Sequence, residues 1–250
     1  DIAFGQSNAA SEILKNPDPQ MSNSEFVSYS DYEIEHLRKA VGLSPLEVKY
    51  ELYLGLAYEQ RAQIDPDRLR DWNLMALECY QKSVEMSPAN AYYYNNEGRV
   101  DAALGKFDPT YLPQAEQAYQ KAVHWDPSSP FFIINWANSL DQLGKEKEAQ
   151  AELGQAFQFD PVFTAKILAQ MAFEKYKAGE KQKAFEFLDE AIQGNTSSAE
   201  AYYCRGILYL SEKKKKQALA DFETVKGLQP TPEKNPSIQS LDQFIEQAKD

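Results

Sequence analysis

One short phrase recurs along this chain and constrains the fold more than any other feature. It has Ala, an aromatic residue or Leu four positions later, a small residue three positions after that, and Pro five positions further on. The clearest copies are ALECYQKSVEMSP from Ala76, AEQAYQKAVHWDP from Ala115 and AQAELGQAFQFDP from Ala149. Apolar residues at this spacing followed by Pro predict an amphipathic helix that ends before the Pro. The chain therefore contains a series of similar helices.

Further copies extend the series in both directions. One begins at Ala184, with Thr196 in the place of Pro, and one begins at Ala218 and ends at Pro230. A divergent copy lies upstream, with Leu37, Ala40 and Pro45 in place and Glu33 instead of the first Ala. The later copies are about 34 residues apart, which is the period of a repeat made of two helices and a turn. Each phrase is predicted to be the second helix of such a hairpin.

The first helix of each hairpin carries a partial match to the pattern W-x2-L-G-x2-Y. The matching positions are Leu54, Gly55 and Tyr58, then Tyr94 and Gly98 with Asp101 where Tyr is usual, and then Tyr202, Gly206 and Tyr209. The small residue of this pattern lets the two helices of a hairpin approach closely. With these motifs the chain resembles the tetratricopeptide-repeat (TPR) family over residues 48–230. The resemblance implies an all-α fold, a right-handed superhelical solenoid of TPR helical hairpins.

The same patterns predict how the chain is organised. Residues 1–45 are expected to form a divergent N-terminal helical hairpin, and residues 46–230 five TPR units. Two of these units carry insertions in the hairpin turn, IDPDRLRDW and KFDPTYLP, and SEKKKKQA falls at the turn of the last hairpin. Residues 231–250 are expected to form a C-terminal capping helix, with Ile238, Leu241, Phe244 and Ile245 at helical spacing, because the last repeat would otherwise expose its apolar face. We expect one continuous solenoid domain.

Composition and residue types argue against several classes of function. The net charge of −12 disfavours nucleic acid as a partner, which requires a basic surface. The two histidines and two cysteines show no metal-ligand spacing, and the sequence contains neither a Gly-rich phosphate loop nor a nucleophile elbow. We therefore expect no catalytic residues, no metal, no cofactor and no enzyme activity. Apolar runs are too short for a membrane helix, so the chain as given is expected to be soluble.

The best candidate site is the concave surface, which the exposed positions of the first helices line in this architecture. Asn side chains there can hold the backbone amides of an extended peptide, and aromatic side chains can bury its apolar groups. Arg99 and Lys166 flank Asn135 and could hold a carboxylate. The predicted partner-binding residues are Tyr92, Asn95, Arg99, Phe131, Asn135, Asn138, Lys166, Gln170, Phe173 and Tyr203, and Ile207 lies on the same face.

The trio of Arg99, Asn135 and Lys166 loosely resembles the carboxylate clamp by which some TPR proteins bind the acidic C-terminus of chaperones. The match is incomplete. Gln170 stands where a second cation would help, and the preceding repeat offers Leu52 and Leu56 instead of polar donors. The interpretation that this surface favours is a non-catalytic protein-protein interaction scaffold. It binds a partner peptide or protein in its concave groove, and the sequence assigns no oligomeric state.

An alternative comes from a second resemblance. The opening DIAFGQSNAA, the segment YELYLGLAYEQRA and the stretch ALECYQKSVEMSPANAYYYNNEGRV look like the soluble C-terminal region of O-antigen ligase-like membrane glycan polymerases. The chain also begins without Met, so we expect a processed chain or an excised fragment. This resemblance implies an accessory domain on the non-cytoplasmic side of a membrane, with a membrane-complex component as partner. The catalytic part would then lie outside this chain.

Overall fold

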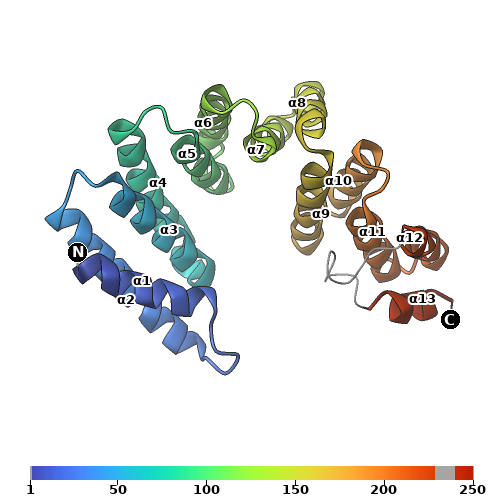
Figure 1. Cartoon of the computed structure of the whole chain (residues 1–250), viewed down its shortest axis with the longest axis horizontal. Coiled ribbons are helices and arrows are strands. Elements are labelled where there is room, and N and C mark those ends of the chain that lie inside the picture. The colour runs from blue at the N-terminus through green and yellow to red at the C-terminus, as the bar shows by residue number, and fades with distance from the viewer. Residues whose placement is uncertain (1, 229–239, 250) are drawn as a thin grey trace. The chain divides into compact units, whose positions relative to one another are not determined.

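The computed structural model describes residues 2–228 and 240–249, and in these ranges it contains thirteen α-helices, two short 3-10 helices and no strand (Figure 1). This confirms the all-α class. Pro230 and Ile238 of the sequence patterns lie outside the described residues. The helices are α1 (Ile2–Lys15), α2 (Asn23–Leu43), α3 (Val48–Ile64), η1 (Pro66–Arg68), α4 (Leu69–Met86), α5 (Ala91–Leu104), η2 (Pro109–Tyr111), α6 (Leu112–Trp125), α7 (Pro130–Gln142), α8 (Glu146–Phe159), α9 (Pro161–Lys177), α10 (Lys181–Gly194), α11 (Ala199–Ser211), α12 (Lys215–Gly227) and α13 (Leu241–Lys249).

The recurring phrase lies in α4, α6, α8, α10 and α12. Four of these helices pack closely against the helix that precedes them, in the pairs α3–α4, α5–α6, α9–α10 and α11–α12. The helices α1 and α2 form a further pair at the N-terminal end. The phrase is therefore the second helix of a hairpin in each of the four pairs.

Glycine sets the close approach within these pairs. A Cβ atom added at Gly55 of α3 would lie 2.6 Å from the ring of Tyr80, and one added at Gly206 of α11 would lie 2.5 Å from the ring of Phe222. Both rings belong to the second helix of the same pair and are fully buried. The aromatic residue of the recurring phrase thus packs directly against the glycine of the first helix.

The chain divides into two compact units, each with its own core. Unit 1 comprises residues 1–128 and 135–149, and unit 2 comprises residues 129–134 and 150–250. Fully buried side chains of unit 1 include Leu37, Tyr80 and Leu104, and those of unit 2 include Leu188 and Phe222. The single continuous domain and the five-unit division expected from the sequence stay predictions.

Each of the two insertions forms one turn of 3-10 helix, in η1 and η2, before the second helix of its pair begins. In the first insertion, the indole Nε1 of Trp72 donates to the carboxylate of Asp65 at 3.0 Å. In the second, the side chain of Asp108 accepts from the backbone N–H of Thr110 at 3.0 Å. The insertions therefore extend their turns by short, internally bonded segments.

The helix α13 packs against α12 and α11 in unit 2. The ring of Phe244 lies 5.9 Å from the rings of both Phe222 and Tyr203, and Ile245 is buried beside them. Among the described residues, no helix combines the length and the apolar character that crossing a membrane requires.

Candidate functional site

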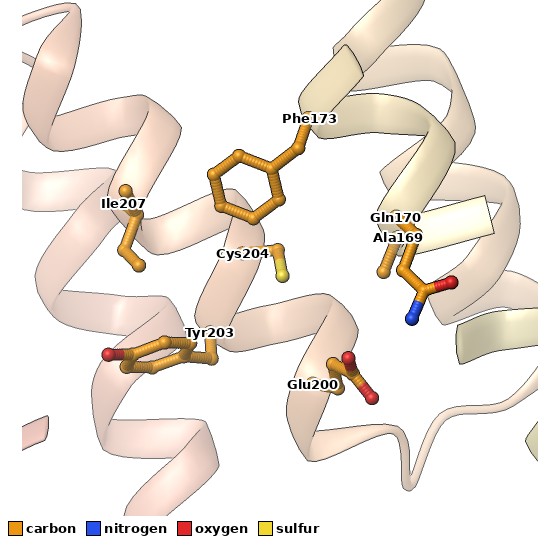
Figure 2. A pocket seen from close by; sticks show the side chains of 7 residues that line it. All are labelled: Ala169, Gln170, Phe173, Glu200, Tyr203, Cys204 and Ile207. Atoms are coloured by element: carbon orange, nitrogen blue, oxygen red, sulfur yellow. The ribbon is translucent and has the colours of Figure 1, made fainter. Parts of the chain in front are cut away.

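A pocket of about 360 Å³ lies in unit 2 between α9 and α11, the first helices of two successive pairs (Figure 2). Three of the predicted groove residues, Gln170, Phe173 and Tyr203, line it together. The other lining residues are Ala169, Glu200, Cys204 and Ile207. The structure therefore brings part of the predicted surface together as a concave site.

Helical spacing explains why these side chains meet. Ala169 and Phe173 are four residues apart on α9, and Glu200, Cys204 and Ile207 are spaced by four and then three residues on α11, so each set shares one face of its helix. Phe173 projects from α9 toward α11, whereas Ala169 contributes only a methyl group to the same face (Figure 2). The pocket lies between these two helix faces.

The walls of the pocket are apolar and its polar groups are few. Gln170 is exposed on α9, and Glu200 is half-buried on α11. Burial raises the pKa of Glu200, and the nearby charge of Lys166 opposes that increase. Burial also raises the pKa of the Cys204 thiol to about 12, so this group is a neutral apolar surface at physiological pH.

Tyr203 contributes less than the sequence predicted. Its side chain is only 5% exposed, because α13 covers it and its ring packs against Phe222 and Phe244. The sequence pattern placed it correctly on the first helix but did not show that the C-terminal helix would bury it. It forms part of the wall and is mainly a core residue of unit 2.

In unit 1 the predicted cation Arg99 already has a protein partner. Its Nε donates to Glu59 at 2.9 Å, and a second bond joins its Nη2 to the same carboxylate. The hydroxyl of Tyr80 also donates to Glu59. Glu59 lies in α3, outside the repeat motifs, which is why the sequence patterns did not identify it. Arg99 therefore belongs to a bridge between α3 and α5, although its side chain remains 42% exposed.

The predicted Asn residues of unit 1 bond to each other. Asn135 Nδ2 donates to Asn95 Oδ1 at 2.8 Å, and Asn95 is fully buried. Asn138 is half-buried, and within the described part of the chain its Oδ1 has no hydrogen-bond partner. Asn95 is thus unavailable to a ligand as the structure stands. Phe131 is half-buried, whereas Tyr92 is 41% exposed.

The predicted trio is divided between the two units, with Arg99 and Asn135 in unit 1 and Lys166 in unit 2. The carboxylate-binding role of these three residues stays a prediction. Within the described residues, no group of three or more His, Cys, Asp and Glu side chains is placed to hold a metal ion.

Comparison with known proteins identifies the repeat. The tetratricopeptide-repeat family matches residues 199–232, the segment that contains α11 and α12. This chain carries a tetratricopeptide repeat. The matched TPR unit supplies one whole wall of the pocket, because Glu200, Cys204 and Ile207 all lie in α11.

Two TPR proteins resemble longer parts of the chain. A small glutamine-rich tetratricopeptide repeat-containing protein 2 of Mycosarcoma maydis is 29% identical over 84 residues, which is 34% of this chain and 24% of that protein. Interferon-induced protein with tetratricopeptide repeats 2 of Cricetulus griseus is 23% identical over 146 residues, 57% of this chain and 30% of that protein. The chain spans less than a third of the length of either relative.

A solved structure extends the likeness to nearly the whole fold. The thermophilic TPR protein TTC0263 of Thermus thermophilus is 15% identical, with a TM-score of 0.50, over 99% of this chain and 98% of that protein. At this identity the likeness concerns the fold alone. It supports the TPR solenoid fold predicted from the repeats. None of these three proteins bears on the resemblance to glycan polymerases, which stays a prediction.

Sequence reasoning missed Glu200 and Cys204, although both lie in the TPR unit that was recognised. The groove positions were chosen for aromatic, amide or cationic side chains, and neither residue is of these types. Spacing could have found them, because Glu200 and Cys204 are separated from Ile207 by whole helical turns.

Proposed function

We propose that this chain is a non-catalytic TPR scaffold that binds a segment of a partner protein, with the pocket between α9 and α11 as its main anchoring point. The observation that carries this proposal is the pocket itself, a concave apolar space on the first helices of two successive repeats. A volume of about 360 Å³ is at the small end of the range for ligand sites. It suits a single large apolar side chain of a peptide.

The chemistry of the lining supports binding over catalysis. Catalysis by a nucleophile requires an activated group with a base in hydrogen-bond reach. The Cys204 thiol is buried, and its raised pKa keeps it protonated at neutral pH. Gln170 does not titrate, and Glu200 faces the pocket with no hydrogen bond or ion pair in the described part of the chain. The lining therefore offers a shaped apolar surface with two polar groups that can orient a ligand.

Displayed peptides test the proposal directly. A library of short random peptides is selected against the purified chain, and the enriched peptides are synthesised and titrated by calorimetry. We expect Phe173→Glu to weaken their binding about tenfold or more, because it places a charge where the apolar side chain is bound. The control is Val162→Glu, the same charge change at an exposed position of α9 outside the pocket, which should leave affinity unchanged.

Circular dichroism and melting curves establish that both variants remain folded. If the enriched peptides bind wild type and Phe173→Glu equally well, the pocket is not the anchoring point. If selection enriches no peptide, the scaffold proposal itself is wrong for peptide ligands.

A further inference from the structure

We infer that the segment bound between α9 and α11 carries a Lys or Arg beside its apolar anchor, and that Glu200 binds this cation. The inference rests on the proposed function and names the chemistry of its ligand. It follows from the distribution of polar and apolar groups around the pocket, from the bonding state of the carboxylates nearby and from the charge of the whole chain.

The pocket separates an apolar part from a polar part. Phe173 on α9 and Ile207 on α11 form apolar parts of the lining, and Glu200 lies two helical turns from Ile207 along α11 (Figure 2). An apolar side chain therefore has its best contacts near Phe173 and Ile207. Seven helical residues span about 10 Å, so the long side chain of a Lys or Arg that flanks the anchor can extend to Glu200.

Among the described residues, Glu200 differs in its bonding from Asp189, Asp221 and Glu212, the other carboxylates around α11. Asp189 and Asp221 both accept hydrogen bonds from Arg205, and Glu212 pairs with Lys181 at 2.7 Å. In the described part of the chain, Glu200 makes neither an ion pair within 4.0 Å nor a hydrogen bond. Its carboxylate is thus the site of unmatched negative charge on this wall.

Partial burial makes that unmatched charge significant. Glu200 is half-buried, and the loss of hydration raises its pKa. A partly desolvated carboxylate gains more from a cationic partner than a fully hydrated one does. Lys166 contributes a favourable charge from α9 but is itself exposed and makes no ion pair with Glu200. A ligand cation would complete the interaction that Lys166 leaves incomplete.

The charge of the chain favours the same ligand. The net charge of −12 attracts a basic segment over long range and repels an acidic one. An acidic terminus that reached Lys166 would also bring its carboxylate close to Glu200, and like charges at short range are unfavourable. The pocket therefore selects against the acidic peptide ends that a carboxylate clamp would bind.

A displayed library with a fixed anchor provides the test. The central residue is held as Phe or Leu, and its neighbours are varied among Lys, Arg, Gln and Glu. We expect wild type to enrich Lys and Arg beside the anchor. In calorimetric titrations, Glu200→Gln should weaken binding of the Lys-flanked peptide about fivefold and leave the Gln-flanked peptide nearly unchanged. Glu200→Lys should instead favour the Glu-flanked peptide.

The control variant is Glu223→Gln, which removes one carboxylate from an exposed position of α12 and should change no affinity. Enrichment of Glu or Gln beside the anchor, or equal loss of all three peptides in Glu200→Gln, overturns the inference. A different result contradicts the proposed function, namely peptide binding that is equally strong in wild type and Phe173→Glu. Phe173-dependent binding without a preference for Lys or Arg would therefore reject this inference and keep the scaffold.

Discussion

At the scale of single residues, the structure gives a physical reason for the glycines of the repeat. Gly98 shows the same relation as Gly55 and Gly206, since a Cβ added there would lie 3.0 Å from the ring of Tyr119. Gly154 differs, because it is exposed in the interior of α8 and a Cβ added there would meet nothing within 4 Å. Packing therefore requires glycine at positions 55, 98 and 206 but not at position 154.

We predict opposite effects for the same substitution at Gly206 and Gly154. Gly206→Ala should lower the free energy of unfolding by about 1–2 kcal/mol, because Phe222 is fully buried and cannot move away. Gly154→Ala should raise it by about 0.5–1 kcal/mol through helix propensity. Urea titrations of both variants check the pair. Stabilisation by Gly206→Ala would mean that the hairpin can open to accept a methyl group.

A second prediction concerns Asp101, which occupies a position where the repeat usually has Tyr. Asp101 is 2% exposed, and burial together with the charge of Glu97 raises its pKa from 3.8 to about 7. A raised pKa in the folded state gives stability that is present below pH 4 and is lost as the pH rises toward 7. Asp101→Asn should therefore increase the free energy of unfolding at pH 8 by about 1–3 kcal/mol.

The difference between Asp101→Asn and wild type should shrink at pH 4, where the carboxyl group is protonated in the folded protein. Thermal melts from pH 4 to pH 8 measure it. Parallel stability curves for the two proteins would show that Asp101 does not titrate in this range.

Sequence reasoning at this scale succeeded for packing positions and was weaker for polar ones. The repeat pattern identifies Tyr80 and Gly55 because their spacing is fixed by the hairpin. It could not show that Arg99 would be paired with Glu59, forty positions earlier in the chain, or that Asn95 would be buried against Asn135. Such pairings depend on the distance between side chains of different repeats, which a spacing rule within one repeat does not contain.

At the scale of elements, three hairpin turns share one backbone geometry but differ in the residue that adopts it. Gly144 and Gly179 have positive φ values of 74° and 85°, and Lys213 has a φ of 58° at the corresponding place. In each turn the next residue donates its N–H to a carbonyl five positions back, as Lys214 does to Tyr209 at 2.8 Å. This left-handed conformation at a helix C-terminus favours glycine.

We therefore predict that Lys213→Gly stabilises unit 2. The substitution removes the unfavourable left-handed conformation of a residue with a Cβ, which costs about 1 kcal/mol. The same substitution at Lys216, inside α12, should lower the free energy of unfolding by a similar amount. Chemical denaturation compares the two variants. A loss of stability in Lys213→Gly would show that the lysine side chain contributes more than its backbone costs.

The helices themselves were largely predictable, whereas the turns between them were less so. The recurring phrase located α4, α6, α8, α10 and α12, because its spacing follows directly from the helical period. The insertions were recognised by length alone, and their folding into η1 and η2 depends on local hydrogen bonds of Asp65 and Asp108. These bonds are set by the chain geometry at each turn and not by the repeat.

At the scale of the whole molecule, the chain divides into two compact units, and α13 covers an apolar face of the second. The 34-residue period predicted the type of fold, because a regular series of hairpins buries its faces only by stacking. It did not predict the division into units. The period alone carries no information about that division.

Because repeats contact mainly their neighbours, damage to one end should remain local. We predict that Ile245→Asp, which places a charge in the contact of α13, destabilises unit 2 by about 2–4 kcal/mol. Amide hydrogen exchange should accelerate in α11 and α12 and remain unchanged in α3 and α4. Gln243→Asp introduces the same charge at an exposed position of α13 and is the matched control. Equal acceleration in both units would indicate a single cooperative structure.

The two cysteines provide a native reporter for each unit. Cys79 lies in unit 1 and Cys204 in unit 2, both are 5% exposed, and burial raises the pKa of both thiols. A thiol reagent can reach the Cys79 sulfur only after the surrounding helices separate, so its reaction rate counts opening events of unit 1. Cys204 also lines the pocket between α9 and α11, so its reaction rate falls when a ligand fills the pocket. With one cysteine replaced by Ser at a time, the reaction rate of the remaining thiol is measured under native conditions. The Cys79 rate would then measure opening of unit 1, and protection of Cys204 would measure occupation of the pocket.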